Sequence, residues 1–265
     1  MLGAIIGDII GSRFEFYNGK IMEDFALLTR ACEFTDDTVM SVAVGDALMK
    51  SGLEADEKTI KENVVIAMRS WGRKYPYAGY GGRFRRWLSS PDPKPYMSYG
   101  NGSAMRVSAV GWLYPSLERT LEVAKWTAEV THNHPEGIKG AQCTAAVIYM
   151  ARMGKDKNEI KEYVKKTFGY PVDLSLDELK KMHGDKESCQ DSLPKALAAF
   201  FEGKNYEDTV RIAVLFGGDT DTVAAIAGSM SEAYSGIPGE LLIKSKGYLN
   251  NEVSEVIERF NEMLR

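Results

Sequence analysis

Three glycines stand four residues apart at the start of the chain, at Gly3, Gly7 and Gly11, within the apolar stretch MLGAIIGDIIGSRF. Residues four apart share one face of a helix, so a helix here would have a face without side chains. Another backbone can approach such a face closely, because glycine has no Cβ. The sequence therefore predicts that residues 1–11 form a buried, central helix.

Most of the remaining chain also has apolar residues at helical spacing, whereas alternating strand patterns bounded by turns are scarce. We therefore expect an all-α fold, and 265 residues suit one domain spanning residues 1–265. The Gly-, Pro- and Tyr-rich stretch 75–103 predicts an irregular loop, and the polar segment 169–192 predicts a connection. The predicted helices after the first are 36–50, 56–73, 104–113, 117–131, 135–153, 156–167, 193–203, 206–216, 221–235 and 250–264.

Composition and charge argue against several classes of protein. A net charge of −4 argues against a general nucleic-acid binder, so no stable nucleic-acid partner is expected. The three cysteines, Cys32, Cys143 and Cys189, show no CxxC-type pairing, which is typical of reduced thiols in a cytoplasm. The apolar N-terminal stretch lacks a basic leader and is interrupted by Asp8, so no signal peptide is expected. No run reaches membrane-spanning length, and nothing in the sequence indicates an oligomeric state.

Two acidic motifs stand near opposite ends of the chain. Residues 34–38 read FTDDT at the start of a predicted helix, and residues 217–222 read GGDTDT before another. Clustered carboxylate and hydroxyl oxygens suit Mg²⁺ or Mn²⁺ rather than zinc. Four acids brought together would repel one another without cations. The alternative is that the motifs are two unrelated helix caps, with Thr35 or Asp36 capping the first helix.

With these motifs the chain resembles the ADP-ribosylglycohydrolases. The resemblance is carried by residues 7–15 (GDIIGSRFE), 35–38 (TDDT), 100–106 (GNGSAMR), 131–132 (TH) and 217–222 (GGDTDT). It implies a compact all-α orthogonal helical domain whose central cleft holds two Mg²⁺ ions, with Mn²⁺ as the alternative. The ligands implied by the resemblance are Thr35, Asp36, Asp37, Asp219, Asp221 and Thr222.

The resemblance also implies a reaction. ADP-ribose would lie in the cleft with its distal ribose against the metals, and hydrolysis would break the bond from C1″ to the target. Two cations can hold ribose hydroxyls and lower the pKa of a bound water. Glu15, Asp36 and Asp219 are the implied catalytic residues, and the sequence leaves the general acid and general base unassigned. Apart from the resemblance, the sequence favours interpreting Glu15 as a solvated acid beside Arg13 and Glu23.

Candidate ligand-binding residues follow. Gly100, Asn101, Gly102 and Ser103 precede a predicted helix and could bind a diphosphate through backbone N–H groups, whereas a turn capped by Ser103 is the plainer alternative. His134 is interpreted as a capping or surface residue, and Ser192 with Pro194 as the start of a helix. From the resemblance, Met105 and His132 are expected to contact the ligand. Tyr80, chosen from the aromatic residues of the segment 75–99, is predicted to stack against it.

The expected substrate is ADP-ribosyl-arginine on protein, because its hydrolysis is the commonest activity attached to this pattern. Serine-linked ADP-ribose, O-acetyl-ADP-ribose and ADP-ribosylated nucleic acid would use a similar metal centre. The Tyr- and Arg-rich segment 75–99 could stack an adenine or receive the target, or could be a structural loop. Two other readings stay open: a non-catalytic ADP-ribose binder, and a two-metal phosphohydrolase that releases AMP.

Overall fold

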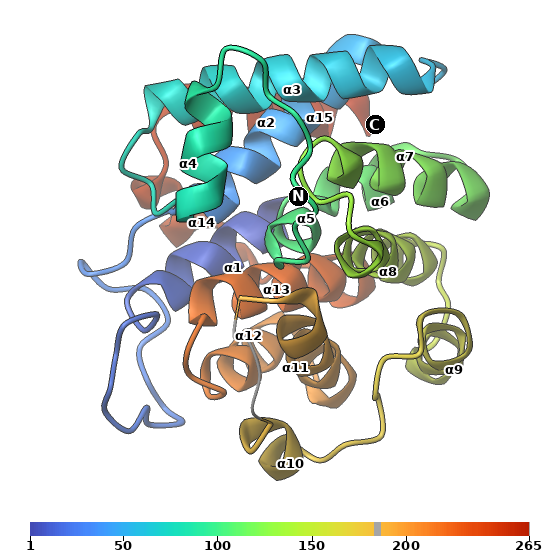
Figure 1. Cartoon of the computed structure of the whole chain (residues 1–265). Coiled ribbons are helices and arrows are strands. Elements are labelled where there is room, and N and C mark those ends of the chain that lie inside the picture. Colours follow the sequence, from blue (N-terminus) through green and yellow to red (C-terminus); the bar gives the residue numbers. More distant parts are fainter. Residues whose placement is uncertain (183–186, 265) are drawn as a thin grey trace.

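The computed structural model describes residues 1–182 and 187–264, and within them the fold is all-helical (Figure 1). The all-α prediction is confirmed, because the described residues contain no strand and only one isolated β-bridge, between Gly100 and Ser188. The helices are α1 (Leu2–Ser12), α2 (Asp36–Ser51), α3 (Glu57–Lys74), α4 (Gly82–Ser89), α5 (Gly102–Met105), α6 (Ser108–Leu113), α7 (Leu117–Glu129), α8 (Pro135–Arg152), α9 (Lys157–Phe168), α10 (Leu176–Lys180), α11 (Cys189–Glu202), α12 (Tyr206–Val214), α13 (Thr220–Ser235), α14 (Gly239–Ser245), the 3-10 helix η1 (Lys246–Tyr248) and α15 (Asn251–Met263).

Helix α1 lies against α13 at the centre of the molecule (Figure 1), and the predicted glycine face makes the contact. A Cβ built at Gly7 would lie 2.2 Å from the carbonyl oxygen of Ala224, and one at Gly3 would lie 2.4 Å from that of Gly228. Gly11 is as close to the start of α13, with a Cβ position 2.5 Å from the Thr220 oxygen. The two helices therefore run antiparallel with their backbones in contact, as the glycine spacing predicts.

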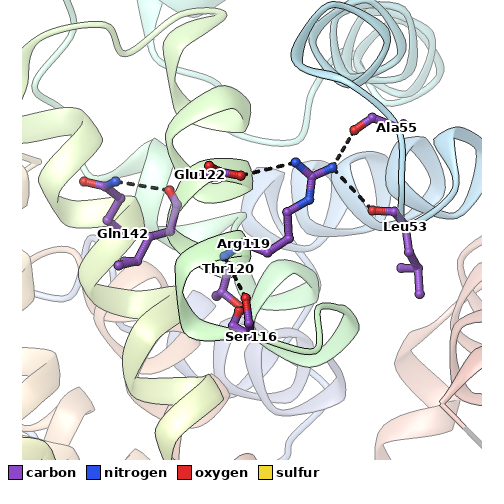
Figure 2. Close-up of polar contacts among 8 residues, drawn as sticks. Leu53, Ala55, Ser116, Arg119, Thr120, Glu122 and Gln142 are labelled. Carbon is purple, nitrogen blue, oxygen red and sulfur yellow. Dashed lines mark hydrogen bonds and ion pairs between the residues drawn. The ribbon is translucent and has the colours of Figure 1, made fainter.

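Helix α7 is joined to its neighbours by side chains that bond backbone carbonyls. Arg119 on α7 reaches the α2–α3 connection, where its Nη2 donates to the carbonyl oxygens of Leu53 (3.3 Å) and Ala55 (2.5 Å) (Figure 2). On the other side, Gln142 of α8 donates to the carbonyl oxygen of Leu121 at 3.1 Å. Helix α7 is thus fixed between α3 and α8.

The stretch 75–103 departs from the prediction, because it contains helix α4. Glycines and prolines at both ends suggested an irregular loop, but the eight residues of α4 contain no proline and place Trp87 and Leu88 in the core. Leu88 packs on α3 at Gly72, where a Cβ would lie 2.8 Å from the Leu88 methyl carbons. Burial of these two large side chains, with Leu88 against α3, outweighs the weak local signal.

Other boundaries also differ. The predicted helix 104–113 is two helices, α5 and α6, and the segment 169–192 contains α10; its residues 183–186 lie outside the described part of the chain. The interpretation of Ser192 and Pro194 as a helix start is wrong. Helix α11 begins at Cys189, where the Ser188 side chain accepts from the Asp191 N–H, and Pro194 lies inside the helix. His134 caps α8, as predicted, by accepting from the Glu136 N–H at 3.1 Å.

The three cysteines are buried free thiols. In the described part of the chain, no helix has the length and apolar character needed to cross a membrane.

The α1–α13 contact leads to a stability prediction. Gly7→Ala should lower the free energy of unfolding by about 3 kcal/mol, because the added methyl would overlap the α13 backbone. Gly239→Ala is the matched control in exposed helical backbone with open space around it, and should change stability by less than about 0.5 kcal/mol. Urea unfolding followed by circular dichroism measures both, and equal effects of the two substitutions would contradict the close packing.

Candidate active site

The candidate site is a cleft of about 670 Å³ where segments far apart in the sequence meet. One end is formed by the residues after α1 and by the N-termini of α2 and α13, and the other by the loop before α5 and by His132. A second pocket of about 810 Å³ is larger and lies between Phe34, Tyr75 and Tyr248. It gathers no comparable set of acids, so the smaller cleft is the candidate. The acidic residues that line this candidate cleft are Glu15, Asp36, Asp37, Asp219, Asp221 and the exposed Glu187.

The first acidic motif begins α2. Thr35 is the cap of this helix, and its hydroxyl oxygen accepts from the Asp37 N–H at 3.3 Å. The Asp36 N–H donates to the Ala78 carbonyl at 2.7 Å, which fixes the turn against the 75–80 segment. Neither carboxylate is used in capping, so the side chains of Asp36 and Asp37 are left to line the cleft.

Asp8 organises this motif, and its role was missed from the sequence. The carboxylate of Asp8 is fully buried and accepts four hydrogen bonds, from the N–H and hydroxyl of Thr35 (2.9 and 2.8 Å) and from those of Thr38 (3.0 and 2.5 Å). The available signal was a single acid in an otherwise apolar helix. Such an acid is costly to bury unless it is bonded in this way, and it holds the start of α2 against α1.

The second motif begins α13. Gly217 and Gly218 have φ values of 69° and 75°, so the chain makes a left-handed turn that glycine accommodates. Asp219 occupies the cap position of α13 but makes no side-chain capping bond. The prediction that Thr35 or Asp36 caps α2 is confirmed for Thr35, whereas the alternative that both motifs are only helix caps is wrong, because Asp219 caps nothing.

The two motifs are in direct contact. The hydroxyl of Thr222 donates to Oδ2 of Asp37 at 3.1 Å. Glu15, Asp219 and Asp221 each offer a carboxylate oxygen, and these oxygens lie within 4.8 Å of one another. The structure therefore brings Glu15, predicted as catalytic, into the same group as predicted metal ligands.

Burial and the neighbouring negative charges raise the pKa values of the acids in this group. Burial raises the pKa of Asp36 to about 8, with further increases from the charges of Asp8 and Asp219. Burial and the charge of Glu15 likewise raise the pKa of Asp221 to about 8. The pKa of Glu15 rises to about 7 through burial and the nearby Asp219 and Glu187 charges. Burial places the pKa values of Asp37 and Asp219 well above the usual range.

These residues fit a divalent cation. The Oδ1 of Asp37 is buried without a hydrogen-bond partner, although a buried carboxylate oxygen is normally bonded. The donor set is carboxylate and hydroxyl oxygen, which hard cations such as Mg²⁺ and Mn²⁺ prefer. Of the six predicted ligands, five line the cleft, and Thr35 lies behind its wall, bonded to Asp8.

At the other end, the predicted ligand-binding residues divide into two groups. Gly100, Asn101, Gly102, Met105 and His132 line the cleft. The amide of Asn101 donates to Oδ2 of Asp219 at 2.5 Å and so positions that carboxylate.

Ser103 and Tyr80 do not line the cleft. The hydroxyl of Ser103 donates to the Gly137 carbonyl at 2.7 Å in the interior, and the ring of Tyr80 is buried beside Phe84. The aromatic side chains that line the cleft are Phe16, Tyr17, Phe84, Tyr96 and Tyr99. Phe84, Tyr96 and Tyr99 belong to the segment 75–99, for which the sequence suggested a ligand or target surface, whereas no role was assigned to Phe16, Tyr17 or Arg106, which also lines the cleft. No motif marks them apart from Arg106, which stands in the GNGSAMR motif.

Comparison with known proteins identifies the family of this chain. The model of the ADP-ribosylglycohydrolase family matches residues 1–264. The chain belongs to this family. ADP-ribosylhydrolase ARH3 of Xenopus tropicalis is 26% identical over 95% of this chain and 91% of that protein. ADP-ribosylarginine hydrolase Tri1 of Pseudomonas putida is 26% identical over 90% of this chain and 70% of that protein.

A solved structure described as an ADP-ribosylglycohydrolase-related protein complex has the same fold. It superimposes with a TM-score of 0.73 at 24% identity and covers 100% of this chain and 96% of its own. Membership of the ADP-ribosylglycohydrolase family makes this chain a glycohydrolase that acts on ADP-ribose conjugates.

The carboxylate group of this ADP-ribosylglycohydrolase predicts an unusual dependence of stability on pH. Without divalent cations, the free energy of unfolding should fall as pH rises from about 4 to 8, because the folded protein keeps protons on Asp36, Asp221 and Glu15 that the unfolded chain releases. Saturating Mg²⁺ should restore stability at pH 8, by about 2.7 kcal/mol at 100 times the dissociation constant. Thermal unfolding in EDTA and in Mg²⁺ across this range measures the trend.

Asp37→Asn provides the internal control for this trend. It replaces an acid whose ionisation is disfavoured by burial and by the Asp221 charge, so at pH 8 it should raise the melting temperature in EDTA while reducing the increase caused by Mg²⁺. A metal-free protein that gains stability from pH 4 to 8 would contradict the charge arrangement.

Proposed function

We propose that the enzyme hydrolyses the N- or O-glycosidic bond between ADP-ribose and a modified target, with ADP-ribosyl-arginine on protein as the main substrate. The observation that supports this most is the convergence of two acidic motifs on one cleft. We further propose that residues 1–265 act as a single domain and that the site takes two Mg²⁺ ions, with Mn²⁺ as the alternative. When bound, these ions would supply positive charge that holds ribose hydroxyls and favours attack by water at C1″.

Five cleft-lining residues would hold the ions, namely Asp36, Asp37, Asp219, Asp221 and Thr222. Thr35 is the sixth proposed ligand. Its hydroxyl donates to Asp8 and accepts from the Asp37 N–H, which leaves one oxygen lone pair for a cation. The unpartnered Oδ1 of Asp37 supports the assignment of that residue.

Glu15 and Asp219 are the proposed proton-handling residues. Each has a carboxylate in the cleft that could accept a proton from the attacking water or return one to the leaving group. One oxygen of Asp219 accepts from Asn101, whereas Glu15 is only half-buried and better placed to reach the substrate. We therefore favour Glu15 as the group nearest C1″, with Asp36 acting beside it.

Two features favour arginine as the linked residue. The leaving group would be a guanidinium cation, which the acidic end of the cleft attracts, with the charge of Glu187 close enough to affect Glu15. The Pseudomonas putida relative is named as an ADP-ribosylarginine hydrolase. The diphosphate would lie at Gly100, Asn101 and Gly102 beside His132, with Met105 against the ligand.

Asp36→Asn tests this proposal. It keeps the size of the side chain but removes a ligand charge, so kcat/KM for an ADP-ribosyl-arginine peptide should fall about a hundredfold or more. Helical content should be unchanged, because Asp36 makes no side-chain capping bond. Release of ADP-ribose is followed by mass spectrometry, with the exposed Asp92→Asn as the acid-to-amide control.

The same assay decides between the alternatives. Intact ADP-ribose released from the arginine peptide and abolished by EDTA supports the proposal, whereas selective cleavage of a serine-linked peptide would change the linkage. AMP as product would indicate a phosphohydrolase. Binding of ADP-ribose without any cleavage would indicate a non-catalytic binder.

A further inference from the structure

Arg106 is a buried cation without an acidic partner. Its side chain is 1% exposed, although it borders the cleft. The guanidinium donates to the Gly102 carbonyl (3.0 Å), the Thr127 carbonyl (3.0 Å) and the Thr131 hydroxyl oxygen (2.9 Å). All three acceptors are neutral, and no carboxylate in the described residues forms a salt bridge with Arg106. A buried guanidinium is normally paired with an acid, so this one requires another explanation.

The bond to Thr131 fixes the direction of the next hydrogen bond. A guanidinium can only donate, so the Thr131 oxygen must accept from Arg106. The Thr131 hydroxyl proton is then directed to Nδ1 of His132, which lies 2.7 Å away and is its remaining neighbour among the described residues. Nδ1 is therefore the acceptor, and the ring proton of a neutral His132 resides on Nε2.

His132 is held in this neutral form. Burial, together with the positive charges of Arg106 and Arg83, lowers its pKa well below the usual range. A doubly protonated ring would also place an N–H on Nδ1, opposite the hydroxyl proton that Thr131 directs toward it.

The Nε2 atom faces the two glycines that precede α5. A Cβ built at Gly100 would lie 3.4 Å from Nε2, and one at Gly102 would lie 3.3 Å from it. His132, Gly100 and Gly102 all line the cleft, and no described residue forms a hydrogen bond with Nε2. An N–H donor therefore lies in the cleft beside two glycines, where no Cβ hinders the approach of a ligand atom.

We propose that Arg106 and Thr131 are positioning residues that hold His132 as a neutral Nε2–H donor for an anionic group, a diphosphate, in the cleft. The guanidinium acts through Thr131 and also adds positive potential near the anion. The identity of the anion rests on the proposed function, whereas the position of the ring proton does not.

The proton position is measured by ¹⁵N NMR of the full-length protein labelled at histidine. The chain has three histidines, so comparison with His132→Gln identifies the signal of His132. At neutral pH the expected spectrum has a protonated Nε2 and an unprotonated Nδ1. A proton on Nδ1, or on both nitrogens, would overturn the proposal even in an active enzyme.

Binding experiments test the hydrogen-bond relay from Arg106 through Thr131 to His132. The probes are ADP and adenosine, at constant Mg²⁺ concentration. Thr131→Val keeps the shape of the side chain but lacks the hydroxyl, so the dissociation constant for ADP should rise about tenfold. Adenosine has no phosphate, so its affinity should be unchanged. Thr131→Ser keeps the hydroxyl and should retain ADP affinity and the Nε2–H form. Equal loss of both probes, or failure of serine to restore binding, would show that Thr131 is only structural.

The kinetic readout separates this proposal from the proposed function. In an active enzyme, Thr131→Val should raise KM and leave kcat within about twofold, because binding rather than chemistry is altered. If the wild-type protein hydrolyses no ADP-ribosyl substrate but shows the expected proton position and ADP selectivity, the relay is supported and the proposed function is wrong.

Discussion

The close packing of α1 on α13 determines the geometry of the candidate site. The helices are antiparallel, so the end of α1 meets the start of α13, where a Cβ at Gly11 would lie 2.6 Å from the Cα of Asp221. The hydroxyl of Thr220 also donates to the Gly11 carbonyl at 2.9 Å. This backbone contact fixes Glu15, four residues beyond Gly11, relative to Asp219 and Asp221. A side chain at this interface would push the two helices apart. It would therefore also increase the distance between Glu15 and the carboxylates of Asp219 and Asp221.

Asp8 extends the same arrangement to α2. Because its carboxylate bonds both Thr35 and Thr38, the first acidic motif is held against α1 opposite the second motif. The result is a dense group of acids whose pKa values are raised by burial and by mutual repulsion. Such a group lowers stability in the absence of cations, and its retention in a helical core is typical of a binding site.

The sequence predicted the features that depend on local spacing or on one motif. The glycine face of α1, the two acidic motifs and the His134 cap needed no knowledge of distant contacts. Features decided by tertiary packing were missed. Helix α4 depends on burial of Leu88 against α3, and Asp8 has a role only because α2 begins beside it.

Tyr80 illustrates the same limit. It stands in an aromatic and basic segment that suggested a ligand surface, yet its ring is buried beside Phe84 while its neighbours line the cleft. The sequence shows how many aromatic residues the segment has, but not which of them face inward. That depends on the direction of α4, which packing on α3 determines.

The cleft has opposite charge requirements at its two ends. The carboxylate end needs cations, and the end near Arg106 has a buried cation without an acid, so each end is unfavourable when it is alone. Asn101 joins them, since its side chain bonds Asp219 while its backbone lies between the two glycines that face His132. A ligand with a diphosphate at one end and hydroxyl-rich sugar at the other would satisfy both requirements in the presence of metal. Metal and diphosphate should therefore each increase the affinity of the cleft for the other, because each relieves a charge that the protein has already buried.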